Sequence, residues 1–298
     1  IAQDNLRNPL QDYLNDLTWD GQPRLSRWLA LAFGVAEDRV HELIGRRWLI
    51  QAVARALRPG CKADVVLVLM RKQGIRKSSA LRELAGVEYF SDSPIPIGEG
   101  PRAMSQVYSA WVHELSELAS LRGKAVEDVK SFITKTHDDF QPLYARSQVH
   151  WARFSVFAGT TNEDYFLSDP TGARRFWPVR ALKVDLDWIK QNRDQLWAEA
   201  VCAVEAGEPW WLDQAAEDES ICVLAVVVKP ALHDGVSIPQ AIGEQVGACQ
   251  GFQDIGRGRV VAGVAIVASG RLTARDVAQA SRVVATKAAI ERLQEVLG

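Results

Sequence analysis

Lys77 and Ser78 stand where a buried strand would give way to a helix. Residues 65–70 (VVLVLM) form a continuous apolar run, the pattern of a strand that is buried on both faces of a parallel sheet. Backbone N–H groups at a helix start bind phosphate, while a lysine there reaches the terminal phosphates and the next hydroxyl binds Mg²⁺. The sequence therefore predicts a site for ATP and Mg²⁺. Its nucleotide-binding candidates are Gln73, Gly74, Ile75, Arg76, Lys77, Ser78 and Ser79.

Two arginines depart from the usual phosphate-loop pattern. The pattern G-x-x-x-x-G-K-[ST] has glycines where this sequence has Arg71 and Arg76. If position 76 keeps a backbone with φ > 0, a side chain there costs roughly 1 to 2 kcal/mol and crowds the phosphate. Two interpretations stay open: weakened or lost binding, or a relaxed Arg76 that adds positive charge at the phosphates.

Acidic residues close the next apolar segment. Residues 110–118 (AWVHELSEL) read as a strand that carries Glu114 and Glu117 near its end. Carboxylates at the end of a strand beside a phosphate loop can hold Mg²⁺ and polarise the attacking water. Both glutamates are therefore catalytic candidates, and Ser78 and Glu114 are the metal-ligand candidates. The alternative is a helix with two solvated glutamates three positions apart. We expect His113 to be exposed or hydrogen-bonded rather than a ligand.

An asparagine and two arginines complete the candidate chemistry. Residues 154–158 (FSVFA) read as a third strand, and Asn162 follows it with a side chain able to orient water against a γ-phosphate. Residues 167–178 are predicted to form a turn that carries Arg174 and Arg175. Arginines near a transferred phosphoryl group stabilise its charge, in cis or from a neighbouring subunit. Alone, an arginine pair is usually surface charge.

Several further segments have a helical period and must position these residues. We expect helices at 10–17, 24–33, 38–57, 124–136 and 188–206, and a loop at 138–146. In the fourth helix Lys130 is predicted to point outward. The third helix carries Arg46, Arg47, Arg55 and Arg58. These arginines form either a DNA-facing stripe or a solvated helix face, and the solvated face is favoured.

Composition and charge describe a globular chain. Its 298 residues, 47% of them hydrophobic and 24% charged, suffice for one large domain or two modest ones. A formal net charge of -2 excludes a globally basic nucleic-acid binder, so DNA contact must come from a local patch or a ring of subunits. The four cysteines lack metal-ligand spacing and predict free thiols in a reducing compartment. No apolar run approaches the length of about 20 residues that spans a bilayer, so we expect a cytoplasmic location without a membrane partner.

The candidate segments together resemble the virulence-associated E (VirE/VapE-like) family, over roughly residues 8–212. The matching blocks are Lys77-Ser78, W-V-x-E-L-x-E-L at 111–118, Lys130-Ser131-Phe132, Tyr144-x-Arg146, G-T-T-N at 159–162 and D-P-T-G-x-R-R-F-W-P at 169–178. The last block is the most specific. This resemblance implies a P-loop NTPase related to superfamily 3 helicases, carried by phages, plasmids and genomic islands, often behind a primase-like N-terminal region.

The resemblance also implies roles for the site residues. Lys77 and Ser78 would bind nucleotide, and Glu114 with Glu117 would form the acidic pair. Asn162 would be the sensor, and Arg174 or Arg175 the arginine finger. We expect an ATP-binding, helicase-like replication ATPase of a mobile element that works on DNA as a homo-oligomeric ring, with a primase-like N-terminal region or partner. The alternative is a non-hydrolysing DNA-binding or assembly subunit with a degenerate loop.

The expected fold class is α/β, a P-loop NTPase core with a parallel sheet. A helical region at 1–60 precedes a core at 61–182, and a helical extension at 183–220 precedes a divergent, poorly ordered tail at 221–298. Because the chain starts at Ile1 in mid-pattern, we expect a fragment of a longer protein whose N-terminal part is missing. A small-molecule P-loop kinase is disfavoured, since no arginine-rich lid insertion or second substrate motif is evident.

Overall fold

The computed structural model describes residues 8–71, 74–97, 99–116, 124–141, 147–162 and 175–212. All of them belong to the first of two units into which the chain divides, Ile1–Val228. The tail predicted at 221–298 lies outside the described residues. Within the described ranges, no helix is long and apolar enough to cross a membrane.

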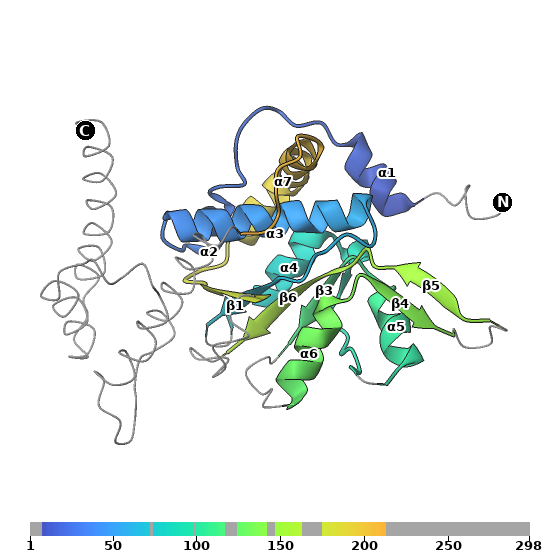
Figure 1. Cartoon of the computed structure of the whole chain (residues 1–298). Coiled ribbons are helices and arrows are strands. Elements are labelled where there is room, and N and C mark those ends of the chain that lie inside the picture. The colour runs from blue at the N-terminus through green and yellow to red at the C-terminus, as the bar shows by residue number, and fades with distance from the viewer. Residues whose placement is uncertain are drawn as a thin grey trace, which may run out of the picture. The chain divides into compact units, whose positions relative to one another are not determined.

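A five-stranded parallel sheet forms the centre of this unit (Figure 1). Its strand order is β2-β3-β6-β1-β7, and each neighbouring pair is parallel. The strands are β1 Val66–Met70, β2 Phe90–Ser91, β3 Val112–Leu115, β6 Val156–Thr161 and β7 Phe176–Arg180. All residues of β1, β3 and β6 are buried, which explains why β1 reads as a continuous apolar run. The predicted α/β class with a parallel sheet is confirmed.

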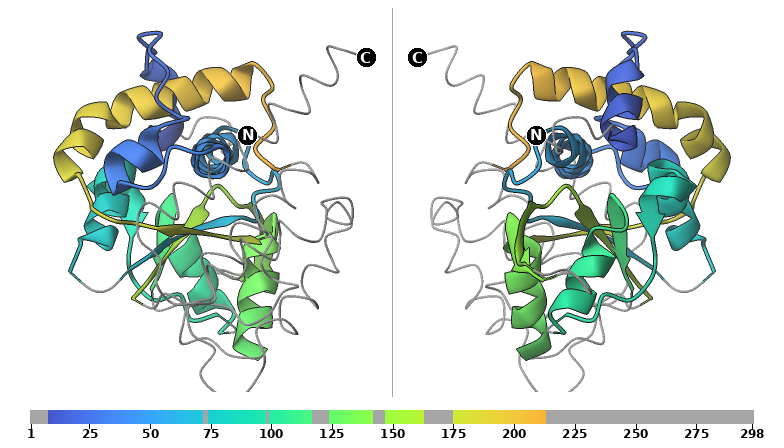
Figure 2. Two further views of the ribbon diagram at one scale, coloured as in Figure 1. Left: turned by 90° about the vertical axis from the view of Figure 1, so that its left-hand side faces the viewer. Right: turned by 90° about the vertical axis from the view of Figure 1, so that its right-hand side faces the viewer.

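Five helices cover one face of the sheet (Figures 1 and 2). They are α1 Pro9–Asp16, α2 Trp28–Phe33, α3 Arg39–Leu57, α4 Lys77–Ala85 and α7 Leu186–Glu205. A short 3₁₀ helix, η1 Val87–Tyr89, follows α4. Helices from the predicted N-terminal region and from the predicted extension thus share one core with the central sheet.

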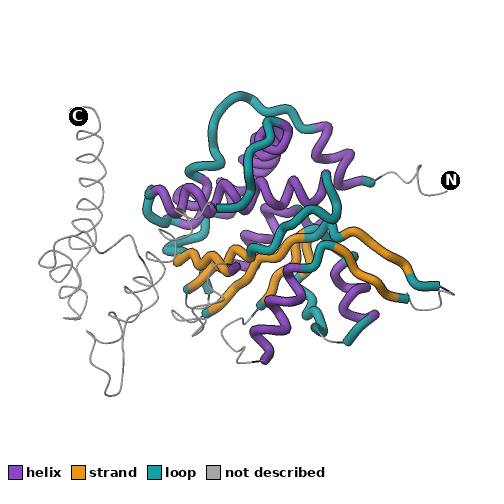
Figure 3. Tube along the Cα trace, viewed as in Figure 1, coloured by secondary structure: helices purple, strands orange, loops and turns teal. Residues whose placement is uncertain are grey.

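Helices α5 (Pro101–Val107) and α6 (Lys124–Thr134) cover the opposite face, together with a two-stranded antiparallel sheet (Figure 3). Its strands are β4 His137–Phe140 and β5 Val149–Ala152. The outward orientation predicted for Lys130 is wrong. Its side chain is only 4% exposed, and its Nζ atom donates to Oε1 of Glu127 at 2.7 Å.

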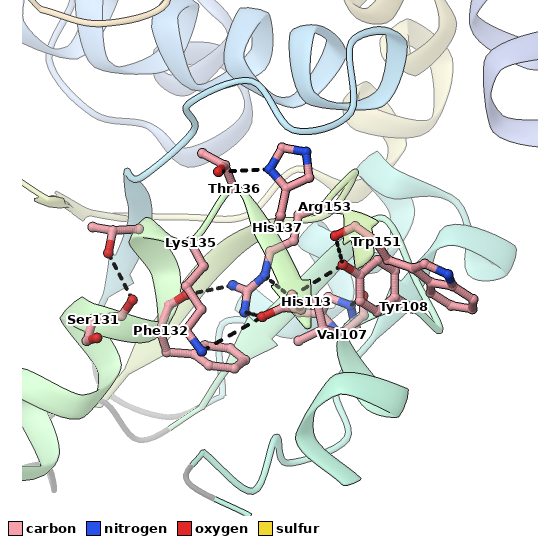
Figure 4. Close-up of polar contacts among 12 residues, drawn as sticks. Val107, Tyr108, His113, Ser131, Phe132, Lys135, Thr136, His137, Trp151 and Arg153 are labelled. Atoms are coloured by element: carbon pink, nitrogen blue, oxygen red, sulfur yellow. Dashed lines mark hydrogen bonds and ion pairs between the residues drawn. The ribbon is translucent and has the colours of Figure 1, made fainter. Parts of the chain in front are cut away.

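Strand β4 contradicts the loop predicted from residue 138. The buried residues of β4 are Asp138 and Phe140, so one of its two inward positions carries a charge. Arg153 neutralises this carboxylate, with its Nε atom 2.5 Å from Oδ2 and its Nη2 atom 2.8 Å from Oδ1. The guanidinium also lies over the ring of Phe132 and donates to the carbonyl of Phe132 (Figure 4). Hydrophobic alternation could not reveal a strand whose buried face depends on a distant arginine.

Strand β7 also begins inside a predicted turn. The turn was expected to run to Pro178, but the strand extends from Phe176 to Arg180. Within the described sheet β7 pairs only with β1, so it is an edge strand. Proline lacks the N–H that an interior strand would need, and an edge position tolerates this loss.

The four arginines predicted from this segment do not form one solvated helix face, although Arg58, which follows the end of α3, is exposed. Arg55 is fully buried and donates to the backbone carbonyls of Cys61 and Lys135. Arg46 and Arg47 each lie 2.6 Å from a carboxylate oxygen of Glu208, just beyond the end of α7. These side chains hold the end of α7 against α3. Arg58 donates to the carbonyl of Val204 in α7.

Candidate functional site

The carboxyl ends of three parallel strands, β1, β3 and β6, lie at one edge of the sheet, and the candidate residues meet there. Lys77 and Ser78 open the helix that follows β1, Glu114 lies in β3, and Asn162 directly follows β6. Strand β6 pairs with both β1 and β3, so it lies between them. The carboxyl edge of an open parallel sheet is the usual place for a ligand site. Glu114 therefore lies in a strand, and the helical alternative for its segment is excluded.

Lys77 links the first and third of these segments. Its side chain is only 7% exposed, and its Nζ atom donates to the carbonyl of Arg71 at 2.5 Å and to Oδ1 of Asn162 at 3.0 Å. Burial lowers the pKa of Lys77 because it removes water from the ammonium group, while the nearby Glu114 carboxylate acts in the opposite direction. The structure thus brings the predicted phosphate lysine, acidic residue and sensor asparagine together.

Glu114 has one satisfied and one unsatisfied oxygen. Its side chain is 4% exposed, and Oε1 accepts hydrogen bonds from Oγ of Ser78 at 2.7 Å and Oγ1 of Thr160 at 2.5 Å. Oε2 is buried and has no hydrogen-bond partner among the described residues. A buried carboxylate oxygen without a partner is costly, and carboxylate and hydroxyl oxygens are suitable Mg²⁺ ligands. Ser78 and Glu114 therefore fit the predicted metal role chemically.

The backbone at Arg76 has the left-handed geometry that the glycine pattern anticipates. With φ 66 and ψ 38, Arg76 is the only described residue other than glycine at positive φ. Its carbonyl accepts the hydrogen bond from the N–H of Ala80 and so belongs to the start of α4. One interpretation required a relaxed backbone at Arg76, with its side chain adding positive charge at the phosphates. Arg76 does not have that relaxed backbone. The arginine bears the conformational cost that glycine would avoid.

The other predicted loop residues have different environments. Ile75 packs partly buried against the core, and Gly74 has φ 103. Ser78 and Ser79 are exposed at the first turn of α4. Three predicted site residues lie outside the described residues: Gln73, Glu117 and Arg174.

Arg175 lies at the wrong end of the sheet to meet the phosphate loop of its own subunit. It precedes β7, whose first residue Phe176 pairs with Val66 at the start of β1. The loop instead follows the end of β1. At about 3.3 Å per residue, the position of Arg175 along the strands is roughly 15 to 20 Å from that of the phosphate loop. By contrast, Arg180 pairs with Met70 and reaches the same edge as Lys77.

The side chain of His113 packs on the face of the sheet that α5 covers. It is fully buried, and its Nε2 atom lies 2.9 Å from the carbonyl of Val107 and 3.1 Å from that of Ala110. Since both partners are acceptors, Nε2 carries the proton. Burial lowers the pKa of His113. The expectation of a hydrogen-bonded histidine rather than a site ligand agrees with this position.

Thr160 is a site residue that the sequence patterns did not single out. It lies two positions before Asn162 in β6 and is 7% exposed. Threonine is common in strands, so its presence there indicates packing as readily as chemistry. Its place in the G-T-T-N block was the available signal, because residues two apart on a strand face the same way.

Comparison with known proteins identifies the family. The family model of the virulence-associated protein E-like domain matches residues 14–222. Comparison with curated proteins gives no match. Among solved structures, the chain is similar to the apo structure of the NrS-1 C-terminal region, with a TM-score of 0.50, 15% identity and 89% of this chain covered.

The chain spans 66% of that region's length. The A form of the same region gives a TM-score of 0.47 at 14% identity, covering 91% of this chain and 68% of the other. At such identities the likeness concerns the fold alone. The family match extends over most of the chain and includes the residues that meet at the sheet edge. The chain therefore belongs to the virulence-associated protein E-like domain family.

Proposed function

We propose that this chain binds ATP with Mg²⁺ and hydrolyses it during replication of a phage, plasmid or genomic island. One observation carries the proposal: the Lys77 ammonium, the Glu114 carboxylate and the Asn162 amide converge at the carboxyl edge of a parallel sheet, beside the start of α4. Lysine, hydroxyl, carboxylate and amide groups in this arrangement are the working parts of a phosphoryl-transfer site.

Nucleotide binding would have to replace the present hydrogen bonds of the Lys77 ammonium group. Its ammonium now contacts the Arg71 carbonyl and Asn162 Oδ1. A β- or γ-phosphate is a stronger partner for an ammonium than either neutral acceptor. Once Lys77 turns to phosphate, Oδ1 of Asn162 is free to accept a hydrogen bond from the attacking water and orient it.

Ser78 and Glu114 would hold the metal ion, since the carboxylate has a buried unpartnered oxygen and the hydroxyl lies beside it. Bound there, Mg²⁺ supplies charge neutralisation for the phosphate oxygens. Glu114 and Glu117 remain the proposed acidic pair.

The position of Arg175 favours an oligomer within this proposal. Because it lies at the amino end of β7, it cannot reach the phosphates of its own subunit without large movement. An arginine finger at this position would serve a neighbouring subunit, as expected of a ring; Arg174 remains an equal candidate. DNA as the substrate, and a primase-like N-terminal region or partner, are proposed from the family resemblance.

A second candidate function is a non-hydrolysing DNA-binding or assembly subunit. The observation that favours it is the left-handed backbone of Arg76, which places a long side chain where close approach of phosphate calls for glycine. In this case the fold and the polar network would persist without turnover.

A lysine substitution tests the enzyme directly. Lys77→Ala removes the phosphate partner, so we expect it to abolish ATP binding and DNA-stimulated phosphate release. Lys62→Ala is a matched control, because Lys62 is exposed and precedes β1 at the other edge of the sheet. If Lys77→Ala changes neither binding nor release, the enzyme assignment is wrong. ATP binding without any turnover in the wild type would select the second candidate.

A further inference from the structure

The hydroxyl of Thr160 is the second donor to the one satisfied oxygen of Glu114. Thr160 and Ser78 both donate to Oε1, whereas Oε2 is buried with no partner among the described residues. A carboxylate held by two donors at one oxygen has a fixed rotation. The free oxygen then points in one direction, which is the condition for a preorganised ligand.

The two donors differ in how firmly they are placed. Ser78 lies at the exposed start of α4, and its oxygen is itself a proposed metal ligand. Thr160 lies in β6 between two hydrogen-bonded strands, where Leu69 of β1 is its registered partner. A group on a buried central strand fixes a neighbour more precisely than a group on a loop or helix end. Thr160 is therefore the anchor that does not depend on the ligand.

We propose that Thr160 is a positioning residue that orients the Glu114 carboxylate so that Oε2 faces the metal bound with nucleotide. This inference rests on the proposed function, since it assumes a metal ion at Ser78 and Glu114. Thr160 donates its hydrogen bond to Oε1 throughout and touches neither the metal nor the phosphates. Hydrogen-bond partners of this kind, one step removed from a metal, typically account for about 10- to 100-fold in metal affinity.

The test compares Thr160→Val, which keeps the shape and removes the donor, with Thr160→Ser, which keeps the hydroxyl. The full chain is titrated with Mn²⁺ at fixed ATP to find the metal concentration for half-maximal binding, and with ATP in excess chelator to find the metal-free affinity. For Thr160→Val we expect the half-maximal Mn²⁺ concentration to rise about 10- to 100-fold. The metal-free affinity should stay at the wild-type value, because Lys77 is untouched. Thr160→Ser should restore the wild-type metal dependence.

Three results would overturn the role of Thr160 while leaving the proposed function standing. The first is a wild-type half-maximal Mn²⁺ concentration in Thr160→Val. The second is a Thr160→Ser variant that needs as much Mn²⁺ as Thr160→Val. The third is a Thr160→Val variant that loses metal-free and metal-dependent ATP binding equally. Thermal unfolding checks the fold of each variant, and Thr160→Ala replaces the valine variant if valine is not tolerated. A wild-type chain that binds no ATP under any condition would defeat the proposed function and this inference together.

Discussion

Arg76 is held in the left-handed backbone region by its neighbours on both sides. Ile75 packs against the core, and the buried Lys77 begins α4. The strain of roughly 1 to 2 kcal/mol therefore cannot relax locally. A glycine would remove the strain but would cost roughly 0.5 to 1 kcal/mol in unfolded-state entropy. The first term exceeds the second by only about 0.5 to 1 kcal/mol, so we expect the arginine to affect binding of the proposed phosphate ligand more than the fold.

We predict that Arg71→Gly combined with Arg76→Gly raises ATP affinity and turnover. The physical reason is closer approach of phosphate to the backbone at position 76, where the Cβ atom is removed. The free energy of unfolding should stay within about 1 kcal/mol of the wild type. Binding isotherms of the double variant and of Arg71→Gly alone measure the gain and assign it. An unchanged isotherm in the double variant would defeat the prediction.

The convergence of the site residues could be anticipated from the sequence because their segments read as successive strands. Lys77, Glu114 and Asn162 each follow or end an apolar run, and parallel strands bring their carboxyl ends to one edge. Thr160 could not be recognised in the same way. Its role depends on a contact with Glu114, 46 positions earlier in the chain.

At the scale of elements, the β4–β5 pair is fastened to α6 and α3 by buried charge. Arg153 and Asp138 are almost fully inaccessible, and Arg153 also donates to the Phe132 carbonyl at the end of α6 (Figure 4). Arg55 of α3 reaches the carbonyl of Lys135 just before β4. Removal of one member would leave an uncompensated charge inside the protein.

We predict that Asp138→Ala lowers the free energy of unfolding by about 3 to 5 kcal/mol, because Arg153 would stay buried without its carboxylate. Asp139→Ala is the matched control. Asp139 is next in sequence but is exposed and, among the described residues, pairs with the exposed His150, so its loss should cost less than about 1 kcal/mol. Denaturant unfolding of both variants measures the difference. Equal values for the two would show that the buried pair does not anchor β4.

Element boundaries could be predicted where apolar periodicity marks them. They could not be predicted where buried charged groups stabilise the element. The predicted helix at 38–57 corresponds to α3, which begins at Arg39 after Asp38 as its N-cap. The same helix shows the limit. In the sequence its arginines resemble a solvated stripe. The structure shows that Arg46 binds Glu199 and Glu208, which lie more than 150 positions later in the chain.

At the scale of the whole molecule, strand order decides which residues act together. The sequence gives the order of the strands along the chain, but β6 inserts between β3 and β1 in space. This places Asn162 next to Lys77 and Thr160 next to Glu114. The pairing of β7 with β1 separates Arg175 from the same site. Because Arg175 lies away from the residues proposed for phosphate, metal and sensor roles, an arginine finger at this position would act on a neighbouring subunit of the proposed ring.

A titration of labelled ATP, with and without Mg²⁺, tests the central claim most directly. We expect saturable binding by the wild-type chain that strengthens with Mg²⁺, because Glu114 then gains a partner for Oε2. The binding should be lost in Lys77→Ala and kept in Lys62→Ala. A wild-type chain that shows no saturable ATP binding, with or without Mg²⁺, would contradict the account.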